Sequence, residues 1–151
     1  MPHDFKKYPE LTNKQMQFYY FESPHKQITE NFRARVVKVH DGDTIRITCN
    51  FRDFDFSMKL TNLQAPELWE AGGIESRDWL AEKILGEEVD IVINPAERVE
   101  KWGRLLGNII FQGVDVGEES VNTGHGKWWW DKEEGKFPDL NKELDTRIWL
   151  S

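Results

Sequence analysis

Residues 36–47 read Val-Val-Lys-Val-His-Asp-Gly-Asp-Thr-Ile-Arg-Ile, and this stretch decides the fold. Two runs with alternating apolar residues flank Asp41-Gly42, and an Asp-Gly pair in that setting is a strong signal for a β-hairpin. The hairpin predicts one strand over about residues 32–39 and a second over about residues 44–50. Its turn places the carboxylates of Asp41 and Asp43 at one end of the sheet.

The chain beyond the hairpin alternates strand patterns with helical spacing. In chain order, we expect a strand at about 56–63, a helix at about 75–85, strands at about 89–93 and 104–111, and helices at about 117–123 and 139–149. This order belongs to the α+β class. Five short strands with an interposed helix suit a five-stranded OB-fold β-barrel with about three helices.

The length of 151 residues fits one domain with a short appendage. We expect a barrel domain over residues 31–151 and an N-terminal extension over residues 1–30. Within the extension, Thr12-Asn13-Lys14-Gln15 matches a helix capping box. The aromatic run Phe18-Tyr19-Tyr20-Phe21 must dock on the domain or lie at an interface. The expected state is a monomer, with self-association through the extension as the alternative.

The composition excludes several classes of protein. A net charge of −7 argues against a protein that only coats nucleic acid, because such proteins are usually basic. It leaves a nuclease open, since a few basic residues can gather at its cleft. The single cysteine, Cys49, rules out an intramolecular disulfide and a cysteine-based zinc site. No apolar run reaches the roughly 20 residues of a membrane span, and residues 1–20 lack a signal-peptide pattern, so we expect a cytoplasmic protein without membrane contact.

Oxygen-bearing residues follow two neighbouring strands of the expected barrel. Asp41 and Asp43 lie at the hairpin turn, and Gln64, Ala65 and Glu67 follow the third strand. If these strands are neighbours, their ends meet at one end of the barrel. Carboxylates, amide oxygens and backbone carbonyls are the ligands of hard cations such as Ca²⁺. Taken alone, each piece has an ordinary alternative, a plain hairpin turn or a loop with an exposed acid.

Basic and aromatic residues lie close to these acids in the expected fold. Lys59 is on the third strand, and Arg104 begins the strand after a charged loop. An arginine supplies two parallel donors to a phosphate, whereas a lysine supplies a point charge. Trp102 precedes Arg104 by two residues, and Trp130 ends the tryptophan run 128–130. Both rings suit stacking on a nucleobase. The ordinary alternatives are packing in the core for the rings and a solvated surface position for the two cations.

Five segments of the chain, taken in order, resemble the staphylococcal-nuclease-like (thermonuclease) family. They are Val-His-Asp-Gly-Asp-Thr at 39–44, Lys-Leu-Thr-Asn-Leu-Gln-Ala-Pro-Glu at 59–67, Lys-Trp-Gly-Arg at 101–104, Val-Asn-Thr-Gly-His at 121–125 and Arg-Ile-Trp at 147–149. The resemblance covers about residues 32–149, so the N-terminal extension falls outside it.

The resemblance implies an OB-fold barrel that cleaves phosphodiester bonds in DNA and RNA with the help of Ca²⁺. It implies that Asp43 is a direct metal ligand and that Asp41 is a supporting acid nearby. Glu67 would be the general base for the attacking water. Arg104 would stabilise the phosphate in the transition state and help the leaving oxygen.

The resemblance also implies that Lys101 and Trp102 hold a terminal phosphate and its nucleotide. Two positions depart from the archetype, which has an aspartate where Gln64 stands and an arginine where Lys59 stands. Gln64 removes one negative ligand, which weakens Ca²⁺ affinity or shifts the choice of metal. Lys59 loses the two-pronged phosphate geometry of arginine.

We therefore predict a hydrolase, a metal-dependent nuclease with Glu67, Arg104 and Lys59 as catalytic residues. Ca²⁺ is the expected cofactor, with Mg²⁺ or Mn²⁺ as alternatives, and the expected substrate is DNA, RNA or both, with single strands preferred. The alternative is a weakened nuclease scaffold that binds single-stranded nucleic acid or a protein partner without cutting. A bacterial or phage host is suggested by analogy only.

Overall fold

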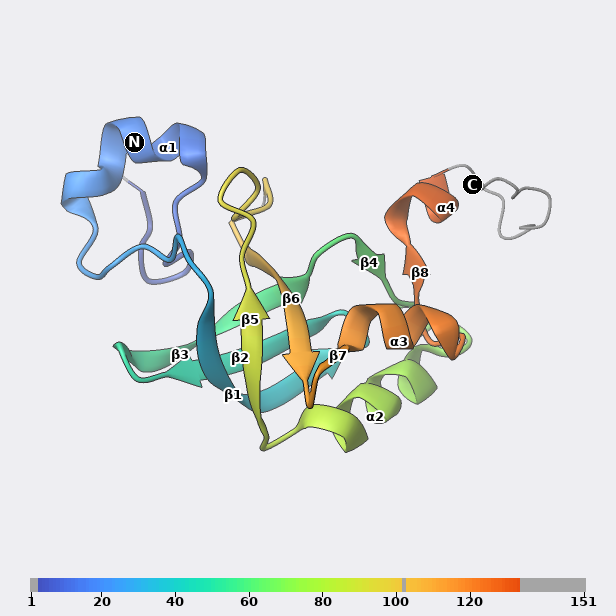
Figure 1. Cartoon of the computed structure of the whole chain (residues 1–151). Helices are drawn as coiled ribbons and strands as arrows, with labels where there is room; N and C mark the ends of the chain where they lie inside the picture. Colours follow the sequence, from blue (N-terminus) through green and yellow to red (C-terminus); the bar gives the residue numbers. More distant parts are fainter. Residues whose placement is uncertain (1–2, 102, 134–151) are drawn as a thin grey trace.

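A computed structural model describes residues 3–101 and 103–133 of the chain (Figure 1). Five strands form the barrel: β1 (Phe32–Asp41), β2 (Thr44–Cys49), β3 (Arg52–Leu60), β5 (Glu88–Val92) and β6 (Leu105–Phe111). Shorter strands are β4 (Leu63–Gln64), β7 (Val114–Asp115) and β8 (Lys127–Trp128). The helices are α1 (Asn13–Tyr19), η1 (Tyr20–Glu22), α2 (Gly73–Ile84), α3 (Val116–Asn122) and α4 (Trp129–Glu133).

The barrel closes because its first and last members are joined by a parallel pairing. β3, β2, β1, β5 and β6 are antiparallel neighbours in that order, and β6 returns to pair with β3, with Met58 opposite Leu105. The predicted hairpin is confirmed, since Asp41 and Thr44 are its last paired residues. The α+β class and the OB-type barrel are confirmed with it.

The apolar core fills the barrel and extends to helix α2. Alternate residues of β2 and β3, among them Ile45, Ile47 and Met58, are fully buried. Helix α2 contributes Leu80 and Ile84, which lie one turn apart and are also fully buried. In Figure 1, α2 lies beneath the barrel with α3 beside it. The turn of the β1–β2 hairpin, which carries Asp41 and Asp43, is therefore attached to the packed core of the barrel.

The third predicted strand, at about 56–63, is wrong in its bounds. β3 starts at Arg52, which pairs with Cys49, so the turn falls on residues 50–51 and the strand begins before the expected start near residue 56. β3 ends at Leu60 because Asn62 adopts a left-handed conformation with φ of 62°. Leu63 and Gln64 then form β4, which pairs with β8 instead of continuing the barrel strand.

The helix predicted at about 139–149 lies outside the described residues. The short strands β7 and β8 and the short helix α4 were not predicted, because two-residue strands and a five-residue helix carry no periodic pattern. Among the described helices, none has the length and apolar character that crossing a bilayer requires.

The N-terminal extension packs on the barrel and starts α1 as predicted. The Thr12 hydroxyl accepts a hydrogen bond from the Gln15 backbone, and the Gln15 side chain accepts one from the Thr12 backbone, which is the expected capping box. In Figure 1 the extension, in blue, lies above the start of β1. The division into residues 1–30 and 31–151 remains a prediction.

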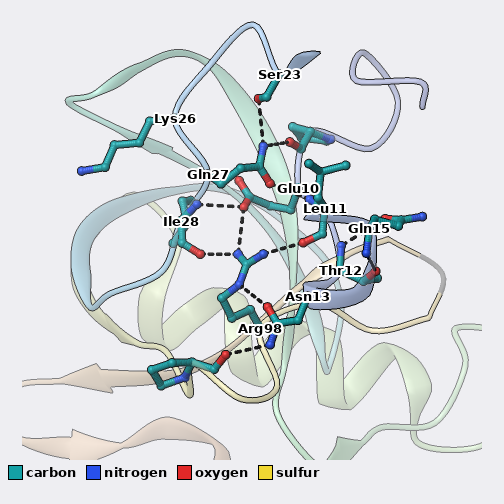
Figure 2. Close-up of polar contacts among 12 residues, drawn as sticks. Glu10, Leu11, Thr12, Asn13, Gln15, Ser23, Lys26, Gln27, Ile28 and Arg98 are labelled. Atoms are coloured by element: carbon teal, nitrogen blue, oxygen red, sulfur yellow. Dashed lines mark hydrogen bonds and ion pairs between the residues drawn. The ribbon is translucent and has the colours of Figure 1, made fainter. Parts of the chain in front are cut away.

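Buried charges hold the extension in place. Arg98, from the loop after β5, is 2% exposed and donates to the backbone oxygens of Leu11 (2.5 Å) and Ile28 (Figure 2). The Glu10 carboxylate accepts from Arg98 (3.4 Å), from the Ile28 backbone N–H (2.9 Å) and from Arg52 at the start of β3 (2.5 Å). A carboxylate from the extension is thus enclosed by two guanidinium groups of the barrel.

Candidate active site

The β1–β2 turn brings Asp41 and Asp43 together. The Asp43 backbone N–H donates to Asp41 Oδ1 at 3.1 Å, a bond typical of a turn that begins with aspartate. The Asp43 carboxylate accepts from the Thr44 hydroxyl at 3.0 Å and from the Ala65 backbone N–H at 2.9 Å. The segment after β4 is therefore bonded directly to the hairpin acid through the Ala65 N–H, whereas the Ala65 carbonyl as a metal ligand stays a prediction.

Gly42, between the two acids, is pressed against helix α2. A Cβ added at Gly42 would lie 2.0 Å from Ser76 Oγ and 2.7 Å from the Ala65 Cβ. The Ser76 hydroxyl in turn donates to the backbone oxygen of His125 at 2.7 Å. Only glycine fits this position, so the turn is held in close contact with α2. Ser76 was not identified from the sequence, because a lone serine in a helix carries no signal.

The two acids repel one another electrostatically. Burial, followed by the hydrogen bond and the charge of Asp43, raises the pKa of Asp41 from 3.8 to about 6. Among the described residues, no group of three or more His, Cys, Asp or Glu side chains is arranged to hold a metal. Two adjacent, largely buried carboxylates nevertheless suit a hard cation, which would relieve their repulsion and take further oxygens from amides, carbonyls and water.

Lys59 lies beside the acids, as predicted. Its Nζ is 3.9 Å from Asp43 Oδ2 and donates to the Leu63 backbone oxygen at 2.5 Å. Burial lowers the pKa of Lys59, the charge of Asp43 opposes this effect, and the charge of Arg104 adds to it. Lys59 therefore lies between an acid and a second cation, where an anion could be held.

Arg104 reaches the same end of the barrel from the residue before β6. Its Nη1 donates to the Thr44 hydroxyl at 3.2 Å, and that hydroxyl is itself bonded to Asp43. Its Nε and Nη2 both donate to the Glu100 carboxylate, Nη2 at 3.3 Å. Thr44 and Glu100 are site residues that the sequence reasoning missed. Both residues of the Glu100–Arg104 pair lie outside helices, where an i, i+4 spacing is no signal for pairing.

Glu67 is exposed and lies in the turn after Ala65. Its backbone N–H donates to Glu70 Oε1 at 2.8 Å, and its backbone oxygen accepts from the Glu70 N–H at 2.9 Å. Among the described residues, no hydrogen bond or ion pair joins the Glu67 carboxylate to Asp43, Lys59 or Arg104. The structure therefore places Glu67 two residues from the site's backbone donor, without fixing its side chain there.

The other predicted residues are distributed around the site. Gln64 lines a cavity of about 390 Å³ together with Ala65, and neither hairpin acid lines that cavity. Trp130 is 41% exposed and stacks on Trp128 at 5.4 Å, beside a different cavity. Lys101 is exposed at the edge of the charged loop, and Trp102 lies outside the described residues.

Comparison with known proteins finds nuclease-named relatives and no matching family model. Micrococcal nuclease of Shigella flexneri is 34% identical over 77 residues, which is 51% of this chain and 41% of that protein. An uncharacterized endonuclease of Escherichia coli O157:H7 is 30% identical over 95 residues, which is 62% of this chain and 59% of that protein. An uncharacterized protein of Bacillus anthracis is 25% identical over 103 residues. The chain spans about half the length of the curated relatives it matches.

Proposed function

We propose that this protein, which its barrel and its relatives relate to the staphylococcal-nuclease-like family, is a nuclease that hydrolyses phosphodiester bonds in a metal-dependent reaction. One observation carries the proposal. Asp43, Lys59 and Arg104 come from three different strands or strand ends and converge at one end of the barrel: the Thr44 hydroxyl joins Asp43 to Arg104, and Lys59 Nζ lies 3.9 Å from the Asp43 carboxylate. Acids for a cation and bases for a phosphate within one site suit phosphoryl chemistry.

Asp43 and Asp41 are the residues that would hold the cation, with oxygens of Gln64 and Ala65 as further ligands. We propose Ca²⁺, with Mg²⁺ or Mn²⁺ as alternatives, because the donors are oxygens only. When bound, the cation would polarise the scissile phosphate. Gln64 supplies a neutral amide, so we expect weaker Ca²⁺ binding than an aspartate at this position would give.

Lys59 and Arg104 supply positive charge to the phosphoryl oxygens. Arg104 donates three of its five N–H groups to Glu100 and Thr44, which holds the guanidinium in place and leaves two donors for a substrate phosphate. Lys59 already faces the carboxylate of Asp43, which fixes its ammonium at the site. Both groups are in place before substrate arrives, which is the condition for electrostatic stabilisation of a transition state.

Glu67 is the proposed general base. Glu67 is exposed and lies two residues after Ala65, whose N–H is bonded to Asp43. In the proposed step, the water oxygen bonds to phosphorus while the bond from phosphorus to the leaving oxygen breaks. Glu67 takes the proton of the water, and Arg104 donates a hydrogen bond to the departing oxygen.

Single-stranded DNA or RNA is the proposed substrate, and the proposed state is a monomer. The stacked pair Trp128 and Trp130 presents a partly exposed aromatic surface, and unpaired bases stack on such surfaces with little regard to sequence. A binding module that does not cut is the second candidate. Two observations favour it: Arg104 is engaged by Glu100, and Gln64 lines a cavity apart from the hairpin acids.

Incubation of the protein with denatured DNA and Ca²⁺, Mg²⁺, Mn²⁺ or EDTA separates the two candidates. We expect cleavage with at least one metal and none in EDTA. We expect Glu67→Gln to lower turnover by about 10²–10⁴-fold, the usual contribution of a general base, while its unfolding midpoint stays unchanged. Wild-type turnover in Glu67→Gln would contradict the assignment of the base. Nucleic-acid binding without cleavage in any metal would favour the binding module.

A further inference from the structure

A second cavity adjoins Arg104 on the side of the N-terminal extension. Its volume is about 240 Å³, and its basic lining residues are Lys6, Lys7, Arg46 and Arg104. The single acid that lines it, Asp55, is paired with Arg46 at 2.6 Å. Arg104 is paired with Glu100, so Lys6 and Lys7 supply the excess positive charge at the cavity, a local reversal in a chain with a net charge of −7. A concave surface of this kind attracts anions.

The sequence of the extension presents Lys6 and Lys7 in a short turn. The Asp4 carboxylate accepts from the backbone N–H groups of both lysines, at 3.1 Å each, and the Asp4 backbone oxygen accepts from the Tyr8 N–H at 2.9 Å. Both lysine side chains are exposed. The turn therefore holds two exposed lysines at the edge of the cavity, with the Lys7 ammonium over the Tyr8 ring at 5.6 Å from its centroid.

Tyr8 fixes this turn against the residue that precedes Arg104. A Cβ added at Gly103 would lie 2.6 Å from the ring of Tyr8, so the ring packs directly on the glycine backbone. Gly103 has a φ of 95°, a conformation that glycine adopts readily. An aromatic ring from the extension thus lies beside the candidate catalytic arginine.

The buried ion pairs of Glu10 anchor the same segment two residues later. Glu10 is 1% exposed and is held by Arg52 and by Arg98, and Figure 2 shows the contact with Arg98. Because the chain is fixed at Tyr8 and at Glu10, the position of Lys6 and Lys7 relative to Arg104 is set by the fold. This arrangement does not depend on the residues that resemble the nuclease family, which start near residue 32.

We propose that Lys6, Lys7 and Tyr8 add a phosphate-binding subsite to the candidate active site, so that the N-terminal extension grips a nucleic-acid strand beyond the phosphate held at Arg104. The proposal rests on the proposed function for its substrate class. Lysines bind backbone phosphates as point charges and release counterions, whatever the base sequence. The Tyr8 ring offers an apolar face for the sugar or base between two phosphates. The subsite therefore favours long strands over short ones.

Fluorescence anisotropy with labelled dT12 and dT2 in EDTA tests the subsite by binding alone. The variant is Lys6→Ala/Lys7→Ala, and the matched control is Lys14→Ala/Lys26→Ala, which removes two exposed lysines of the extension that do not line the cavity. We expect the dissociation constant for dT12 to rise about tenfold in the variant and to stay within about twofold in the control. We expect the affinity for dT2 to be unchanged in both.

The salt dependence gives a second readout. Two lost phosphate contacts on a single strand should reduce the slope of log affinity against log salt by about 1.4. Equal effects of the two double variants would overturn the subsite and indicate a bulk charge effect. A wild type that binds no dT12 would also overturn the subsite. Cleavage is measured separately. If the wild type cleaves and the two double variants bind equally well, the nuclease is supported and the subsite is contradicted. If binding depends on Lys6 and Lys7 but no cleavage occurs, the subsite is supported and the nuclease is contradicted.

Discussion

The hairpin end of the barrel and the anchor of the N-terminal extension both contain buried carboxylates, but the nearest charges around these carboxylates differ. At the anchor, the Glu10 carboxylate is enclosed by the guanidinium groups of Arg52 and Arg98. At the hairpin, burial and the charge of Asp43 raise the pKa of Asp41 to about 6. A buried carboxylate paired with cations fixes a structure, whereas a carboxylate with a raised pKa beside a second carboxylate is typical of a site that exchanges ligands.

Removing the charge at the anchor should give the largest change in stability. Glu10→Gln leaves Arg52 and Arg98 buried without their carboxylate, and breaking a buried ion pair in this way costs about 3–5 kcal/mol. Urea denaturation measures the free energy of unfolding. The control is Glu22→Gln, which removes an exposed acid of the same extension and should change it by less than about 0.5 kcal/mol. Equal stability of the two variants would show that the anchor does not hold the extension.

Arg104→Lys should lower activity strongly. It keeps one charge but removes the two-pronged donor, and the loss of one preorganised donor lowers turnover by about 10²–10³-fold. Single-turnover cleavage of a labelled oligonucleotide measures this change. Arg33→Lys, in an exposed ion pair with Asp90 on the barrel wall, is the control and should leave turnover unchanged. Similar turnover in both variants would remove Arg104 from the mechanism.

The contact between Tyr8 and Gly103 should have an intermediate effect on stability. Gly103 and Gly113 both have positive φ angles, of 95° and 81°, but only a Cβ at Gly103 would meet another residue. We expect Gly113→Ala to cost about 1 kcal/mol from backbone strain alone, and Gly103→Ala to cost about 1–3 kcal/mol more from overpacking. Thermal unfolding of the two variants measures the difference. Equal melting temperatures would mean that Tyr8 can move away freely.

The hairpin should show the smallest effect, and the effect should depend on pH. The pKa of Asp41 in the folded protein lies above its usual value of 3.8, so ionisation of Asp41 disfavours folding. The stability that Asp41 contributes is fully present below about pH 4 and is lost as the pH rises through about 6. Asp41→Asn should therefore be about 1–2 kcal/mol more stable than the wild type at pH 8, with the difference shrinking toward pH 4. A constant difference across this range would contradict the shifted pKa.

The sequence was sufficient for the hairpin because the signals there are local. Asp41-Gly42 between alternating runs predicts both strands and the position of both acids, and Thr12 with Gln15 predicts the start of α1. The barrel order followed from the succession of apolar patterns. Lys59 and Ala65 were placed beside Asp43 by the same reasoning, and the structure brings them together.

The anchor could not be predicted because its partners are far apart in sequence. Glu10 lies 42 positions from Arg52 and 88 from Arg98, and a charged residue in a polar segment carries no signal for a buried partner. Asn62, which ends β3, adopts a conformation that asparagine only sometimes takes. The engagement of Arg104 by Glu100 depends on the path of the charged loop, which no apolar pattern specifies.

We propose that cleavage at the barrel end depends on a cation that Asp43 holds. Ca²⁺ binding by calorimetry and cleavage of single-stranded DNA, measured on the same samples of wild type, Asp43→Asn and the exposed-acid control Asp53→Asn, test it most directly. We predict that Asp43→Asn loses both Ca²⁺ binding and cleavage while keeping its fold, and that Asp53→Asn keeps all three. Cleavage by Asp43→Asn at the wild-type rate would contradict the account.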